Sequence, residues 1–153
     1  MLQKLCVITD INTMKPGANE AFAAVKRMVF EGLSLALFHR RDYYNLPHSR
    51  QKKLTESVSF TTCYSVLSEK PGDGFQTLVL LGRDSLKLYG PEVSFKDFKN
   101  WYGKQLDLGE GRTAIVGQSS YNMVQWLHNP THKASESGVN RATHYIRTAY
   151  QIL

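Results

Sequence analysis

The segment from Leu54 to Gly90 constrains the fold most, because its side chains alternate as a pleated strand requires. Between Ser57 and Ser68, larger or apolar side chains alternate with serine, threonine and cysteine, which is a period of two residues. A cluster of turn-forming residues, Lys70 to Gly74, separates this stretch from the apolar run Phe75 to Leu81. The pattern predicts a long antiparallel hairpin.

The second arm of this hairpin, Phe75 to Leu81, is apolar on both faces. A strand of that kind needs cover on each side, so we expect it to lie centrally in the sheet. Residues Gly82 to Ser85 form a further turn signal, and Leu86 to Gly90 reads as the next strand of a meander.

The rest of the chain predicts both strands and helices around this meander. Strands are predicted at Lys4 to Ile11, at Arg112 to Gly117 and at Tyr121 to Leu127, the last two forming a hairpin. Helices are predicted from Ala18 to about Phe38, from Ser94 and from Ser137. The expected fold class is α+β: an antiparallel sheet of about five to six strands, a meander plus a hairpin, packed against a long N-terminal helix and a C-terminal helix.

The short helix that begins at Ser94 has an S-x-x-D cap, a weaker form of the capping box. We expect its aromatic residues to be buried and its lysines to point outward. The aromatic residues are Phe95, Phe98, Trp101 and Tyr102, and the lysines are Lys96, Lys99 and Lys104.

A chain of 153 residues is long enough to bury a core without disulfides, so we expect a single domain over residues 1–153. The longest apolar run, near Leu33 to Phe38, is far shorter than the roughly 20 residues that cross a bilayer. Cys6 and Cys63 fall within predicted strands without a CxxC pairing, and we interpret both as small buried hydrophobic residues.

Positive charge is concentrated in one segment. The chain has a net charge of +6, and residues 39–53 contain five basic side chains and one acid, which is +4 of that total. Such a field attracts polyanions, although a solvated basic loop is the alternative. Tyr43 and Tyr44 lie in the same loop and suit stacking on unpaired bases. The candidate polyanion-binding residues are Arg40, Arg41, Arg50, Lys52, Lys53, Lys96 and Lys99.

Catalytic and metal-binding patterns are weak. His128 and His132 have the spacing of a metal pair on a helix, but Pro130 between them interrupts such a helix. No short motif ties His39, His48, His132 or His144 to a nucleophile. We therefore expect no cofactor, no metal and no enzymatic activity, with a small histidine-dependent phage enzyme as one alternative.

Three stretches resemble matrix proteins of non-segmented negative-strand RNA viruses. They are Ala23-Ala24-Val25, the run from Leu46-Pro47 to Lys52-Lys53-Leu54-Thr55, which is similar to bornavirus matrix protein, and Phe95-Lys96-Asp97-Phe98, which is similar to rhabdovirus matrix protein. The order of the predicted elements is similar as well.

This resemblance implies a homo-oligomer in the host cytoplasm and the virion that binds the anionic inner leaflet of the membrane and RNA or ribonucleoprotein. The chain departs from the rhabdovirus pattern, because it lacks a disordered basic N-terminal arm and the Pro-Pro-x-Tyr and Pro-Thr/Ser-Ala-Pro budding motifs. The alternative function is a phage or viral accessory protein that binds single-stranded nucleic acid.

Overall fold

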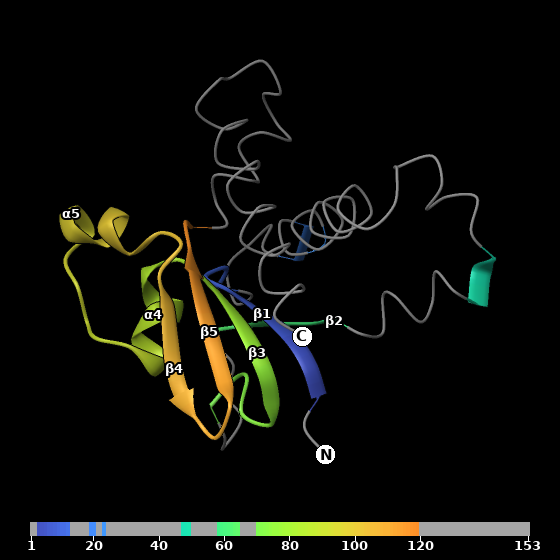
Figure 1. The fold of residues 1–153 in the computed structure, drawn as a ribbon. Helices are drawn as coiled ribbons and strands as arrows, with labels where there is room; N and C mark the ends of the chain where they lie inside the picture. The colour runs from blue at the N-terminus through green and yellow to red at the C-terminus, as the bar shows by residue number, and fades with distance from the viewer. Residues whose placement is uncertain are drawn as a thin grey trace.

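The computed structural model describes residues 3–12, 19–20, 23, 47–49, 58–64 and 70–119. Within these ranges the chain forms one five-stranded sheet with short helices beside it (Figure 1). The strands are β1 (Gln3–Thr9), β2 (Val58–Thr62), β3 (Phe75–Leu81), β4 (Gln105–Gly109) and β5 (Arg112–Gly117). The helices are α4 (Arg83–Tyr89), α5 (Phe95–Phe98) and the 3-10 helix η1 (Lys99–Trp101).

The sheet is mixed, with the strand order β2-β1-β3-β5-β4. β1 pairs in parallel with both β2 and β3, so that Val7 faces Phe60 on one side and Val79 on the other. β3 also pairs in parallel with β5, and only the edge strand β4 runs antiparallel to its neighbour. Four strands therefore end at the same edge of the sheet.

The predicted antiparallel sheet is wrong. β2 and β3 do not form a hairpin, because β1 lies between them and pairs with both. The predicted strand Leu86 to Gly90 is also wrong, since residues 83–89 form helix α4. The strand at residues 112–117, β5, was expected to pair with residues 121–127. It pairs with β4 instead, a strand that the sequence analysis did not predict.

Other predictions are confirmed. The strand expected at Lys4 to Ile11 is β1, and the doubly apolar run is β3, the central strand, which is buried from Thr77 to Leu81. The turns at Gly72 and Gly74 have positive φ angles, 91° and 88°.

The two long predicted helices and the strand at residues 121–127 lie outside the described residues, apart from three residues of the first helix. Asn19, Glu20 and Ala23 have helical backbone. His48 and Ser49 are helical too, which contradicts the expected loop at these two positions.

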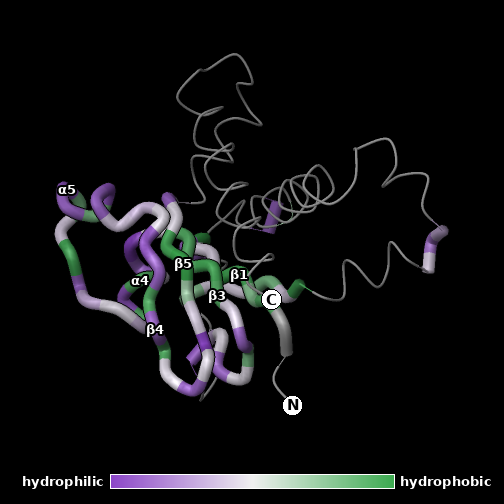
Figure 2. Tube along the Cα trace, viewed as in Figure 1, coloured by the Kyte–Doolittle hydropathy of each residue, from purple (hydrophilic) through white to green (hydrophobic). Residues whose placement is uncertain are grey.

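One face of the sheet packs on α4 and α5. Its inward side chains form a cluster with Leu86 of α4 and Phe98 of α5, and Figure 2 shows hydrophobic residues gathered on the central strands. The members from the sheet are Cys6, Ile8, Leu78, Leu80, Ala114 and Val116. Burial of such side chains contributes about 1.5–3 kcal/mol each, so this cluster anchors the helices that follow β3.

Helix α5 begins where the sequence predicted. The Ser94 side chain accepts a hydrogen bond from the Asp97 backbone N–H at 3.2 Å, which caps the helix. Phe98 is buried, but Phe95 is 84% exposed, so its expected burial is wrong. A helix of only four residues turns one side to the core, and Phe98 takes that side.

Candidate ligand-binding site

The carboxyl ends of the parallel strands bring four segments of the chain together. Asp10 follows β1, Tyr64 lies two residues after β2, Asp84 lies in the first turn after β3, and Ser119 lies two residues after β5. The strand order reverses between β1 and β3, because β2 lies on one side of β1 and the later strands β3, β5 and β4 lie on the other. In open α/β sheets, ligands bind outside the carboxyl ends of the strands at such a switch point.

Asp10 is held at this switch point by its neighbours. It is 9% exposed, and the Ser119 hydroxyl donates a hydrogen bond of 2.5 Å to its Oδ2 atom. The backbone before and after Asp10 is tied to β2, since the Cys63 N–H donates to the Thr9 carbonyl and the Thr62 hydroxyl donates to the Ile11 carbonyl. The carboxylate therefore has a fixed position.

Gly82 allows this close arrangement. Its N–H donates to the Gly117 carbonyl at 3.1 Å, which joins the ends of β3 and β5. Its φ angle is 96°, and a Cβ atom here would lie 2.3 Å from Oδ2 of Asp10. Only glycine accommodates both the backbone conformation and the adjacent carboxylate.

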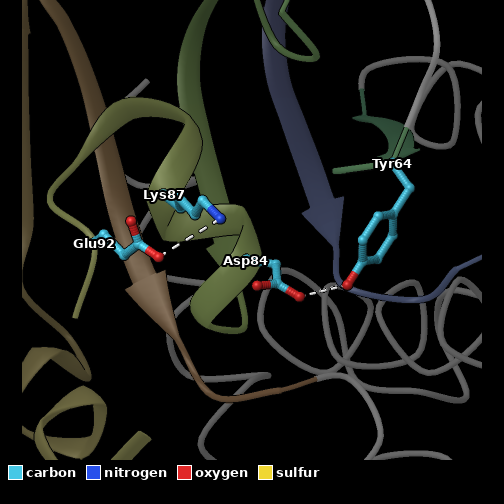
Figure 3. Close-up of polar contacts among 4 residues, drawn as sticks. All are labelled: Tyr64, Asp84, Lys87 and Glu92. Atoms are coloured by element: carbon cyan, nitrogen blue, oxygen red, sulfur yellow. Dashed lines mark hydrogen bonds and ion pairs between the residues drawn. The ribbon is translucent and has the colours of Figure 1, made fainter. Parts of the chain in front are cut away.

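Asp84 projects from the first turn of α4 toward Tyr64, whose hydroxyl donates a hydrogen bond to Oδ2 of Asp84 (Figure 3). This bond raises the pKa of Tyr64, because the phenolate would place a second negative charge beside the carboxylate, and partial burial raises it further. The pair links the segment after β2 to the segment after β3.

A crevice of about 250 Å³ opens beside Asp10 and Asp84. Its lining combines acids and aromatic rings: Asp10, Arg83, Asp84, Phe95, Phe98, Tyr102 and Ser119. The Arg83 guanidinium lies 6.0 Å from the centroid of the Phe95 ring, and Phe98 meets Tyr102 edge to face at 5.2 Å. Carboxylate oxygens accept hydrogen bonds and rings offer flat faces, so the crevice suits a ring-shaped ligand with N–H or O–H groups.

A second cavity, of about 380 Å³, shares Asp84 with the crevice. It is lined by Cys63, Tyr64, Lys70, Asp84, Lys87 and Leu88. Cys63 was expected to be buried within a strand, but it follows β2 and is partly exposed, whereas Cys6 is buried as predicted. Burial raises the pKa of the Cys63 thiol to about 11, and the negative charges of Asp10 and Asp84 raise it too.

No group of three histidine, cysteine or acidic residues in the described ranges is arranged to hold a metal ion. None of the helices in that part of the chain has the length and apolar character needed to cross a bilayer.

The structure places few of the residues that the sequence singled out. Lys96 of α5 and Lys99 of η1 are exposed, as predicted. The remaining candidates lie outside the described residues, and their role stays a prediction: Arg40, Arg41, Tyr43, Tyr44, Arg50, Lys52 and Lys53. The same holds for His128, His132 and His144.

Sequence reasoning missed Asp10, Asp84 and the exposed Phe95. Asp10 directly follows a buried strand, which is the position of many ligand-binding residues in parallel sheets, but this signal has meaning only once the sheet is known to be parallel. Asp84 was assigned to a turn, and Phe95 was assigned to the core.

No protein-family model matches the chain, and comparison with curated proteins finds no significant similarity.

Replacing Gly82 with alanine tests the contact between Gly82 and Asp10. Gly74→Ala is the matched control, because Gly74 has a similar φ of 88° but nothing within 4 Å of an added Cβ. We expect the control to cost about 1–2 kcal/mol from the backbone conformation alone. Gly82→Ala should cost more, because its φ and ψ of 96° and 161° lie in a region that is essentially restricted to glycine, and because the new Cβ also displaces the carboxylate. Urea unfolding of both variants measures the difference. Equal costs would contradict the close contact.

The raised pKa of Cys63 predicts slow alkylation at neutral pH, since only the thiolate reacts. The thiolate fraction rises about tenfold per pH unit below the pKa, so the rate should still be rising between about pH 8 and 10. Iodoacetamide labelling, resolved by peptide mass spectrometry, follows Cys63 separately from Cys6. A rate that levels off near pH 9, as for an ordinary thiol, would disprove the desolvated environment.

Proposed function

We propose that the protein binds single-stranded nucleic acid and takes one nucleoside unit into the crevice beside Asp10 and Asp84. The observation that carries this proposal is Phe95, an aromatic ring that is 84% exposed at the rim of an acid-lined crevice. Because the ring is exposed and also lines the crevice, a base that enters the crevice can stack on it.

Charge around Phe95 supports a polyanionic partner. Arg83 lies over its ring, and Lys96 and Lys99 are exposed on the same short helical segment. The one acid of α5, Asp97, accepts a hydrogen bond from the Ser94 hydroxyl at 2.9 Å. Together with a net charge of +6, these cations favour a phosphate backbone over a neutral partner.

The crevice itself fits the other part of a nucleotide. Asp10 and Asp84 supply acceptors for base amino and imino groups or sugar hydroxyls, whereas two carboxylates repel a phosphate. A volume of about 250 Å³ holds one ring-sized group. Because a base enters such a crevice only when it is unpaired, the proposal specifies a single strand.

The test is fluorescence anisotropy with a labelled single-stranded oligonucleotide of mixed sequence. The wild-type protein should bind it, with an affinity that falls as salt rises. Phe95→Ala should weaken binding about 5- to 150-fold, because one stacked base contributes about 1–3 kcal/mol. Phe95→Trp keeps a stacking surface and should restore most of the affinity.

Gln76→Ala serves as the control, because Gln76 is exposed near the start of β3, at the opposite end of that strand from Asp84. It should leave binding unchanged. If the wild-type protein does not bind the oligonucleotide, or if Phe95→Ala binds as well as wild type, the proposal is refuted.

Membrane attachment of the matrix type is the second proposal, and the exposed lysines Lys96 and Lys99 favour it. Vesicle flotation separates the two. Binding to phosphatidylserine vesicles but not to neutral vesicles, without binding to the oligonucleotide, would support the matrix-type role instead.

A further inference from the structure

The cavity of about 380 Å³ beside Tyr64 differs in chemistry from the crevice, although Asp84 lines both. The crevice presents mainly acceptors and rings. The second cavity has two ammonium groups, from Lys70 and Lys87, and one carboxylate, from Asp84, which leaves a net charge of +1 in its lining. A positive cavity next to an acidic one provides separate places for the two chemically different parts of one ligand.

Asp84 offsets one of the two lysine charges, and the net charge of the lining stays positive. One of its oxygens accepts the hydrogen bond from Tyr64, a residue of the segment after β2 (Figure 3). Lys87 projects from the same helix, α4, one turn further along. The carboxylate is thus tied to a neutral donor rather than to either lysine of the cavity.

Both lysines keep their charge available. The Lys87 ammonium lies 3.8 Å from Glu92, but these side chains are 56% and 78% exposed, so the pair is screened by water and weak. The Lys70 ammonium lies 5.5 Å from the centroid of the Tyr89 ring, a cation–π contact that leaves its charge intact. An anion with strong acceptor oxygens can replace Glu92 beside Lys87. It can also bind the Lys70 ammonium while that group keeps its contact with the Tyr89 ring.

We propose that the second cavity is a phosphate-binding site formed by Lys70 and Lys87. This site deepens the proposed function and rests on it in one respect: the phosphate would belong to the nucleotide whose nucleoside unit occupies the adjacent crevice. A phosphate group carries the charge and the acceptor oxygens that two ammonium donors match. The same chemistry fits a free phosphate-bearing small molecule, and the experiment separates these two sources.

The first measurement titrates the protein with inorganic phosphate and follows amide shifts by NMR, with chloride at equal ionic strength as the reference. We expect saturable shifts at residues 63–64, 70 and 84–88. The double variant Lys70→Gln, Lys87→Gln should bind phosphate at least about tenfold more weakly, because two charge-assisted hydrogen bonds are lost. Lys104→Gln, which removes an exposed cation outside the cavity, should bind as wild type.

Both lysines are exposed, so the double variant should fold, and a thermal melt checks this. If phosphate shifts the amides of the double variant as in wild type, or if Lys104→Gln weakens binding equally, the proposal is overturned. The proposal is also overturned if chloride at equal ionic strength produces the same amide shifts in the wild-type protein as phosphate does.

The second measurement repeats oligonucleotide binding with the double variant. A loss of affinity there, together with the loss of phosphate binding, assigns the site to a backbone phosphate. Unchanged oligonucleotide binding with lost phosphate binding assigns it to a free phosphate-bearing ligand. If the wild-type protein binds no oligonucleotide, the proposed function is refuted. The phosphate titration still tests independently whether Lys70 and Lys87 bind phosphate.

Discussion

The parallel pairing of β1 with both β2 and β3 is the constraint on which the site depends. Because β1 lies between the two strands, Asp10 at its carboxyl end is placed beside the ends of both. The pairing of β3 with β5 then brings Gly82 to the Gly117 carbonyl and Ser119 to Asp10. A hairpin of β2 and β3 would separate these residues, since antiparallel strands end at opposite edges of a sheet.

Asp84 connects the two halves of the functional proposal. It lies at the start of α4, is bound by Tyr64 and lines both cavities. On one side the lining offers acceptors and aromatic faces, and on the other it offers ammonium groups. A nucleotide has the same division, because its base and sugar carry donors and its phosphate carries negative charge. The fold thus creates two adjacent environments of opposite polarity from short segments that follow neighbouring strands.

Sequence patterns predicted the elements whose signals are local. β1, the central position of β3, the glycine turns and the cap at Ser94 all follow from side chains within a few residues of one another. Strand pairing is not local, and the turn-rich residues 70–74 favoured a hairpin that β1 prevents. The doubly apolar character of β3 was in fact typical of a parallel strand. In residues 86–89, Leu-Lys-Leu-Tyr fits a short strand or a helical turn equally well, so the helix α4 was missed, and with it Asp84.

The central claim, that β1 separates β2 from β3 and so brings Asp10 to the β1/β3 switch point, is tested most directly by inter-strand NOEs in solution. The structure predicts backbone NOEs between residues 5–9 and 58–62 and between residues 5–8 and 77–80, with the pattern of parallel strands. Close Hα–Hα contacts between residues 58–62 and 75–81, which only an antiparallel hairpin produces, would contradict the fold and the site built on it.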